Sequence, residues 1–220
     1  GHTGPVQVGE DMSQGATPQN ENGPCPDCGL QYVRGYAPNE RQHRRVHDES
    51  VNGHRTKLPD GFRPVTHGFP ISEQKRVEAA ASTALWETKY DFSSFTAYKK
   101  DAEEQKTIAM LYIKRGRVCG LLVSRQRECK HTASLNSFHP DSFHFWRPTE
   151  VTGVEAHSRR VVEMIWVLKK NRRQGVAKEL VQALAAHCEI KLGDLAHMIP
   201  FRQDALHLWK ALKLSTIYVV

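Results

Sequence analysis

The sequence has no long hydrophobic run. None of its apolar stretches approaches the roughly 18–20 residues that a bilayer-spanning helix needs. The first twenty residues lack the charged and then apolar order of a secretory signal. We therefore expect a soluble intracellular protein that does not associate with membranes.

Paired cysteines are also scarce. The chain has five cysteines, an odd number, and only Cys25 and Cys28 lie close together. This pattern disfavours a disulfide-stapled secreted domain and favours reduced thiols with one metal site. With 39% apolar and 25% charged residues over 220 positions, the composition excludes a disordered acidic tail, a collagen and a coiled coil. It predicts one main domain with at most a small satellite.

Basic residues exceed acidic ones, but unevenly along the chain. Residues 1–60 hold six Lys/Arg and eight Asp/Glu, a balance of −2, so residues 61–220 carry 25 − 16 = +9. A basic domain typically meets an anionic partner, such as nucleic acid, an acidic protein or a phosphorylated cofactor, although a solvated surface gives the same total. The net charge alone does not show which of these partners the domain meets, or whether it meets one.

Two cysteines and two histidines have the spacing of a zinc site. Cys25 and Cys28 form a short knuckle, and His43 and His47 lie one helical turn apart. Such a set can close around one tetrahedral Zn²⁺ ion, with a short helix over residues 41–49 aiming both imidazoles the same way. So polar a segment has little else to fold around.

The pattern of apolar residues predicts an α/β chain. We expect a flexible leader over 1–23, the zinc finger over 24–50, a linker with one edge strand over 51–70 and the main domain over 71–220. The predicted elements of that domain are helices over 71–90, 175–188 and 204–212, and strands over 107–113, 118–124, 161–168, 195–198 and 215–220. Residues 125–158 are polar and predict a long loop.

The turn after the strand 161–168 carries the strongest signal in this domain. It reads Arg172-x-x-Gly175-x-Ala177, which resembles the acetyl-CoA signature of the GNAT acetyltransferase superfamily. Unpaired N–H groups at the helix start, a glycine and two arginines suit a pyrophosphate. The residues expected to contact acetyl-CoA are Val167, Leu168, Arg172, Arg173, Gln174, Gly175, Val176 and Ala177.

The finger and the strand together resemble a more specific family. The run from Cys25 to His47, with Ile165-Trp-Val167 before the turn, is similar to the sister-chromatid cohesion acetyltransferases, in which this finger precedes a GNAT domain. The resemblance implies a GNAT-like mixed sheet with flanking helices and an acyltransferase that uses acetyl-CoA and carries zinc. It also implies a nuclear enzyme whose acceptor is a lysine on an SMC subunit of cohesin.

The sequence departs from that family at two functional positions. The family serine before the tryptophan is Glu163 here, and the family aspartate before a proline is Ile199. A lysine amine is mostly protonated at neutral pH, so the reaction needs a proton acceptor. On a strand face with apolar neighbours, Glu163 is our candidate general base. It could instead be a strand glutamate in solvent or paired with Arg159 or Arg160.

Other residues and other functions remain open at this point. Asp194 and Asp204 are weaker candidates for the base, and Tyr218 could protonate the departing thiolate. The lost serine and aspartate would also fit an acetyltransferase for a small amine or another protein. A third reading is a finger that binds nucleic acid or protein beside an inactive GNAT domain. Direct DNA binding is disfavoured by the acidic balance of residues 1–60.

Overall fold

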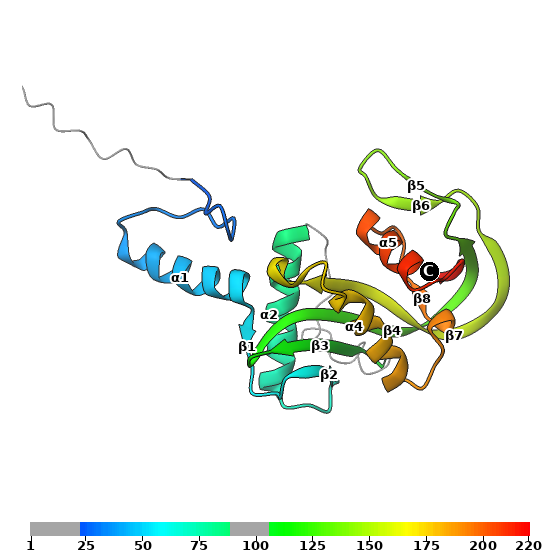
Figure 1. Cartoon of the computed structure of the whole chain (residues 1–220), viewed down its shortest axis with the longest axis horizontal. Coiled ribbons are helices and arrows are strands. Elements are labelled where there is room, and N and C mark those ends of the chain that lie inside the picture. The colour runs from blue at the N-terminus through cyan, green and yellow to red at the C-terminus, as the bar shows by residue number, and fades with distance from the viewer. Residues whose placement is uncertain (1–22, 89–105) are drawn as a thin grey trace, which may run out of the picture. The chain divides into compact units, whose positions relative to one another are not determined.

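A computed structural model describes residues 23–88 and 106–220, so residues 1–22 of the expected leader lie outside it. The chain divides into two compact units whose boundary falls between Val46 and His47. This boundary lies inside the helix α1, Ala37–Asn52, which extends the short helix expected over the two histidines. The larger unit holds the sheet and the remaining helices (Figure 1).

The larger unit contains the predicted helices and strands in the predicted order, with further strands between and before them. The helices are α2 (Ile71–Thr88), α4 (Val176–His187) and α5 (Gln203–Ala211), with 3₁₀ turns η1 (Lys169–Asn171) and η2 (Leu192–Asp194). The strands are β1 (His54–Arg55), β2 (Gly61–Val65), β3 (Ile108–Lys114), β4 (Arg117–Ser134), β5 (Phe138–Pro140), β6 (Trp146–Pro148), β7 (Thr152–Val167), β8 (Ala196–His197) and β9 (Thr216–Val219). The segment 51–70, expected as a linker with one edge strand, contributes β1 and β2.

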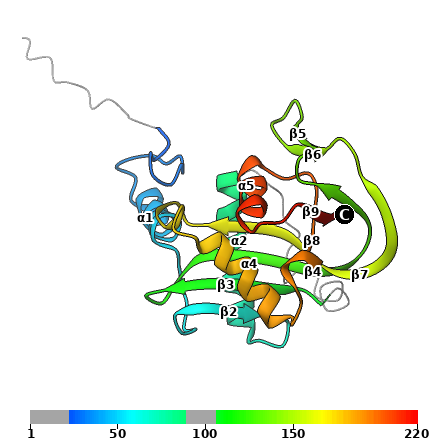
Figure 2. The ribbon, with the colours of Figure 1, turned by 45° about the vertical axis from the view of Figure 1, so that its right-hand side comes forward.

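One mixed sheet organises this unit. Its strand order is β2-β3-β4-β7-β8-β9, with β1 also paired to β4. The pairs from β2 to β7 are antiparallel, whereas β7–β8 and β8–β9 are parallel. The far end of β4 also pairs with β9. The strands β4, β7, β8 and β9 therefore close into a ring, and Figure 2 shows the long strands β4 and β7 curving around the C-terminal end.

The apolar stripe of each helix determines which face of the sheet the helix covers. Helix α2 packs its alanines on one face of the sheet, whereas α4 and α5 pack on the other. The stripe predicted for α4 is confirmed, since its buried residues are Val176, Leu180, Val181, Leu184 and Ala185. At Gly120, a Cβ atom would lie 3.2 Å from the Leu180 side chain, so glycine at this position lets α4 sit close to the sheet.

Residues 125–158 are not the long loop that their polarity predicted. The strand β4 continues to Ser134, β7 begins at Thr152, and a small hairpin of β5 and β6 lies between them. The side chains of 152–158 are exposed, so this part of β7 can be polar and still pair with β4. None of the helices in the described parts of the chain combines the length and apolarity needed to cross a membrane.

Candidate functional site

The strand β7 loses its parallel partner halfway along its length. It pairs with β8 only at Val161 and Val162, and the Met198 N–H donates to the Val162 carbonyl at 3.1 Å. From residue 163 to 167, no strand among the described residues pairs with this edge. The register with β4 also shifts here, because Val123 opposes Met164 and Ser124 opposes Val162. Glu163 is therefore the extra residue of a β-bulge at the start of an open edge.

The open edge leads into the start of α4. Gly175 precedes the helix with φ of 83°, and no side chain caps this end. The Glu179 N–H donates to the Gly175 carbonyl at 3.1 Å, as the first bond of the helix. The N–H groups of the first turn therefore have no acceptor within the helix, and they carry the positive end of its dipole. Such an end can bind the phosphates of a nucleotide cofactor.

The side chains of the predicted cofactor residues divide into two groups. The Arg172 guanidinium turns back toward the protein, where its Nε donates to the Val167 carbonyl at 2.8 Å. The Gln174 amide likewise donates to the Lys170 carbonyl at 2.8 Å. Arg173 is different, because its side chain is 88% exposed and the Asp204 carboxylate that faces it lies 4.0 Å away. Among these three side chains, that of Arg173 is the one placed to meet an anion.

A glutamate on α2 holds this turn, and sequence reasoning missed it. The Glu87 carboxylate accepts a hydrogen bond from the Trp166 indole N–H at 2.6 Å and from Arg172 at 2.5 Å. It therefore joins the end of α2 to β7 and to the first residue of the signature. No local pattern marks Glu87, because its partners lie 79 and 85 residues further along the chain.

Glu163 lies in an ionic setting rather than the apolar one that we expected. Its side chain is 5% exposed and lies 3.4 Å from the Arg125 guanidinium and 2.5 Å from that of Arg127. The partners considered from sequence were Arg159 and Arg160, but the register places the arginines of β4 against this side chain. Two guanidinium groups therefore face this carboxylate.

The other candidate residues lie at three different places. Asp194 in η2 faces Arg159, and the guanidinium carbon of Arg159 stacks 3.3 Å above the centre of the Tyr218 ring. Asp204 is an exposed residue in the first turn of α5. Ile199, at the position of the family aspartate, follows β8, and its N–H donates to the Val220 carbonyl at 3.2 Å. It offers no side chain that can exchange a proton.

The finger brings its four predicted ligands together. One donor atom from each of Cys25, Cys28, His43 and His47 lies within 4.8 Å of every other. The knuckle is closed by the Gly29 N–H, which donates to the Cys25 carbonyl at 2.8 Å, and the Tyr32 ring stacks on His43 with centroids 3.8 Å apart. Two sulfurs and two imidazole nitrogens at this separation fit a tetrahedral Zn²⁺ ion.

Two solved structures of one acetyltransferase domain share this fold. The xEco2 acetyltransferase domain bound to a CoA conjugate has a TM-score of 0.55 and 19% identity, covering 75% of this chain and 95% of that one. Another structure of the xEco2 acetyltransferase domain gives 0.54 and 18%, covering 75% and 93%. An aminoglycoside 6'-N-acetyltransferase from Acinetobacter haemolyticus gives 0.40 and 15%, covering 70% and 90%. No curated protein sequence matches the chain significantly.

Two family models match the sequence itself. The model described as the zinc-finger of acetyl-transferase ESCO matches residues 11–49. The acetyltransferase (GNAT) family model matches residues 75–213, which include α2, the open edge of β7 and the turn before α4. The protein is therefore an acyltransferase with acetyl-CoA as its donor. The chain belongs to the GNAT acetyltransferase family, and it carries ahead of that domain a zinc finger of the ESCO acetyltransferases.

Proposed function

We propose that this enzyme acetylates lysine side chains of a protein, with an SMC subunit of cohesin as the acceptor and the nucleus as its location. The observation that carries the proposal is the ESCO-type finger in the same chain as the acetyltransferase domain. The separation of four Cys and His donors by no more than 4.8 Å supports a finger that is built to fold around zinc.

The chain's own groups supply the parts of the proposed reaction. The first-turn N–H groups of α4 and the exposed Arg173 side chain would hold the cofactor phosphates. The amine attacks the thioester carbon, and the amine proton passes to Glu163 or to water on the open edge of β7. The tetrahedral intermediate then expels the CoA thiolate, which takes up a proton. The bulge places Glu163 at the beginning of this edge.

The test offers the enzyme two classes of acceptor. The full chain is incubated with labelled acetyl-CoA and either a recombinant SMC head domain of cohesin or a panel of polyamines and aminoglycosides. We expect label on the protein, and peptide mass spectrometry should locate it on lysine. The SMC head domain with the modified lysines replaced by arginine is the matched control. Label on the small amines alone would replace the proposal with a small-amine acetyltransferase.

A charge placed at the helix start should weaken cofactor binding. Gly175 has a φ of 83°, and a Cβ at this position meets only the Glu179 carboxylate, at 3.8 Å. Asn and Asp both tolerate this backbone conformation, so Gly175→Asn tests size and Gly175→Asp adds charge. We expect Gly175→Asp to bind acetyl-CoA about tenfold more weakly than Gly175→Asn, measured by calorimetric titration. Equal affinities of the two variants would move the phosphates away from this turn.

A further inference from the structure

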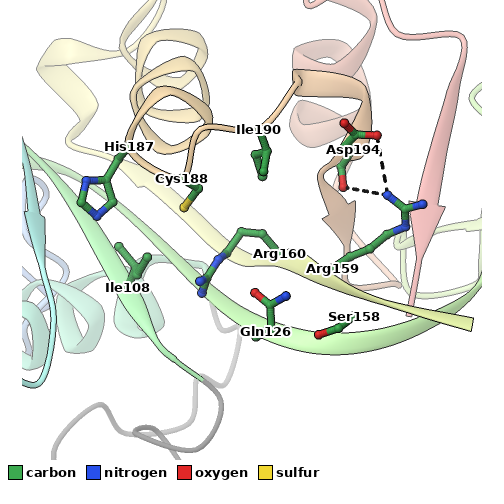
Figure 3. Close-up of a pocket in the computed structure, with 9 residues that line it drawn as sticks. All are labelled: Ile108, Gln126, Ser158, Arg159, Arg160, His187, Cys188, Ile190 and Asp194. Atoms are coloured by element: carbon green, nitrogen blue, oxygen red, sulfur yellow. Dashed lines mark hydrogen bonds and ion pairs between the residues drawn. The ribbon is translucent and has the colours of Figure 1, made fainter.

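A cavity of about 460 Å³ opens at the other end of α4, away from the cofactor turn (Figure 3). It lies beside the last residue of this 12-residue helix, about 18 Å along the helix from its first turn. The residues that line it come from β3, β4, β7, the end of α4 and the segment after α4, and they include Arg160, Gln126, Ile108 and Ile190. None of these four belongs to the candidate site described above.

Arg160 brings a positive charge into this cavity. The residue is only 9% exposed, and its Nη1 donates to the Lys106 carbonyl at 2.5 Å. Its Nε has no hydrogen-bond partner among the residues that the structure describes. Burial lowers the pKa of the guanidinium, and the neighbour that opposes this effect is the Cys188 thiol. Within residues 23–88 and 106–220, no carboxylate forms an ion pair with Arg160.

Each of the neighbouring arginines Arg159, Arg125 and Arg127 faces a carboxylate. Arg159, the next residue on β7, turns away from the cavity centre toward Asp194, as Figure 3 shows, and its Nη1 lies 3.7 Å from that carboxylate. Arg125 and Arg127 both face Glu163. A buried charge without a counter-ion is costly, so a buried guanidinium that opens onto a cavity and has no counter-ion in the described parts of the chain favours an anion there.

The surroundings favour one kind of anion. Arg160 contributes a single charge, and the C-terminal end of α4 beside the cavity carries the negative end of the helix dipole, which disfavours a dianion such as phosphate. Ile108 and Ile190 add apolar wall, which suits a short aliphatic chain. We propose that this cavity binds a small aliphatic carboxylate, with its carboxylate group on the Arg160 guanidinium. The site is separate from acetyl transfer and does not depend on which acceptor the enzyme uses.

The pairing of β4 with β7 allows a substitution to place a carboxylate beside Arg160. Gln126 on β4 is the direct cross-strand partner of Arg160 on β7, and both line the cavity. Opposite residues of an antiparallel pair have Cβ atoms about 4.5–5.5 Å apart, which is within reach of an ion pair. The variant Gln126→Glu therefore supplies a carboxylate from the protein itself, with almost no change in side-chain size.

The experiment uses the full zinc-loaded chain and sodium butyrate as the probe. Melting temperature and ligand-observed NMR are followed during titration, with sodium phosphate and sodium chloride at equal ionic strength as comparisons. We expect butyrate to raise the melting temperature in a saturable way, whereas chloride does not. Arg160→Met should weaken butyrate binding by at least about tenfold. Gln126→Glu should melt higher without any ligand and should lose the butyrate response.

Each alternative outcome overturns the proposal. The control Lys130→Met removes an exposed cation of β4 outside the cavity and should keep the full response. Equal responses of the wild-type chain and Arg160→Met would remove Arg160 from the site. Tighter binding of phosphate than of butyrate would reject the carboxylate class. If Arg160→Met does not fold, the Gln126→Glu variant still tests the site. A melting temperature and a butyrate response that both equal those of the wild-type chain would reject the site.

Discussion

Replacing Glu163 with glutamine is expected to lower turnover by about 10²–10⁴-fold while the affinity for acetyl-CoA stays the same. Glutamine keeps the shape of the side chain but cannot accept the proton of the attacking amine. The loss should shrink as pH rises, because a lysine amine has a pKa near 10.4 and a more basic medium supplies its neutral form directly. Steady-state rates from neutral to alkaline pH, with calorimetric cofactor affinities, measure this.

The same substitution also removes a buried negative charge. The Glu163 carboxylate faces Arg125 and Arg127, and breaking a buried ion pair of this kind costs roughly 3–5 kcal/mol of the free energy of unfolding. Rates must therefore be measured well below the melting temperature of the variant. Arg127→Gln is the matched control, because it breaks the 2.5 Å contact and leaves the carboxylate in place. An equal loss of turnover in both variants would make Glu163 a positioning residue only.

Replacing Cys28 with serine is expected to abolish stoichiometric zinc binding and unfold the segment 24–50. The four donor atoms have a separation of at most 4.8 Å, and α1 has no buried residue to hold it without metal. Zinc can supply roughly 10 kcal/mol or more of folding free energy to such a module. Metal analysis should give one zinc per wild-type chain and close to none for Cys28→Ser, and limited proteolysis should cut the variant within the finger.

Cys188→Ser is the control for this experiment. Cys188 is a half-buried thiol after α4, outside the Cys/His cluster, so its loss should leave the zinc content at one per chain. A Cys28→Ser chain that keeps both its zinc and its protease resistance would show that the metal is held elsewhere. A wild-type chain that loses its zinc to a chelator but keeps the same resistance would show that the finger folds without metal.

The sequence predicts those elements whose residues repeat at one clear period. The apolar stripe of α4 identifies its buried face, and Leu206, Trp209 and Leu212 are buried as α5 requires. The clustering of the four Cys and His residues of the finger was also predictable, since two Cys three residues apart and two His four apart allow few other arrangements. In both cases the information is local.

Features that depend on distant parts of the chain were not predictable. The polar residues 125–158 contain the second half of β4 and the first half of β7, which are maintained by cross-strand pairing rather than by apolar content. The bulge at Glu163 follows from the register between β4 and β7, which also decides that Arg125 and Arg127 face it. Neither the bulge nor the arginines that face Glu163 can be predicted from the sequence of one strand alone.

The contact of Glu87 with Trp166 also makes the site observable by fluorescence. The Trp166 ring is 2% exposed, and its indole N–H is bound by the same carboxylate that holds Arg172. A rearrangement of the turn that shifts Arg172 would change the hydrogen bond and the local field at the indole, and so its emission. In a chain whose other three tryptophans are replaced by phenylalanine, Trp166 would be an intrinsic optical reporter of the state of the cofactor turn.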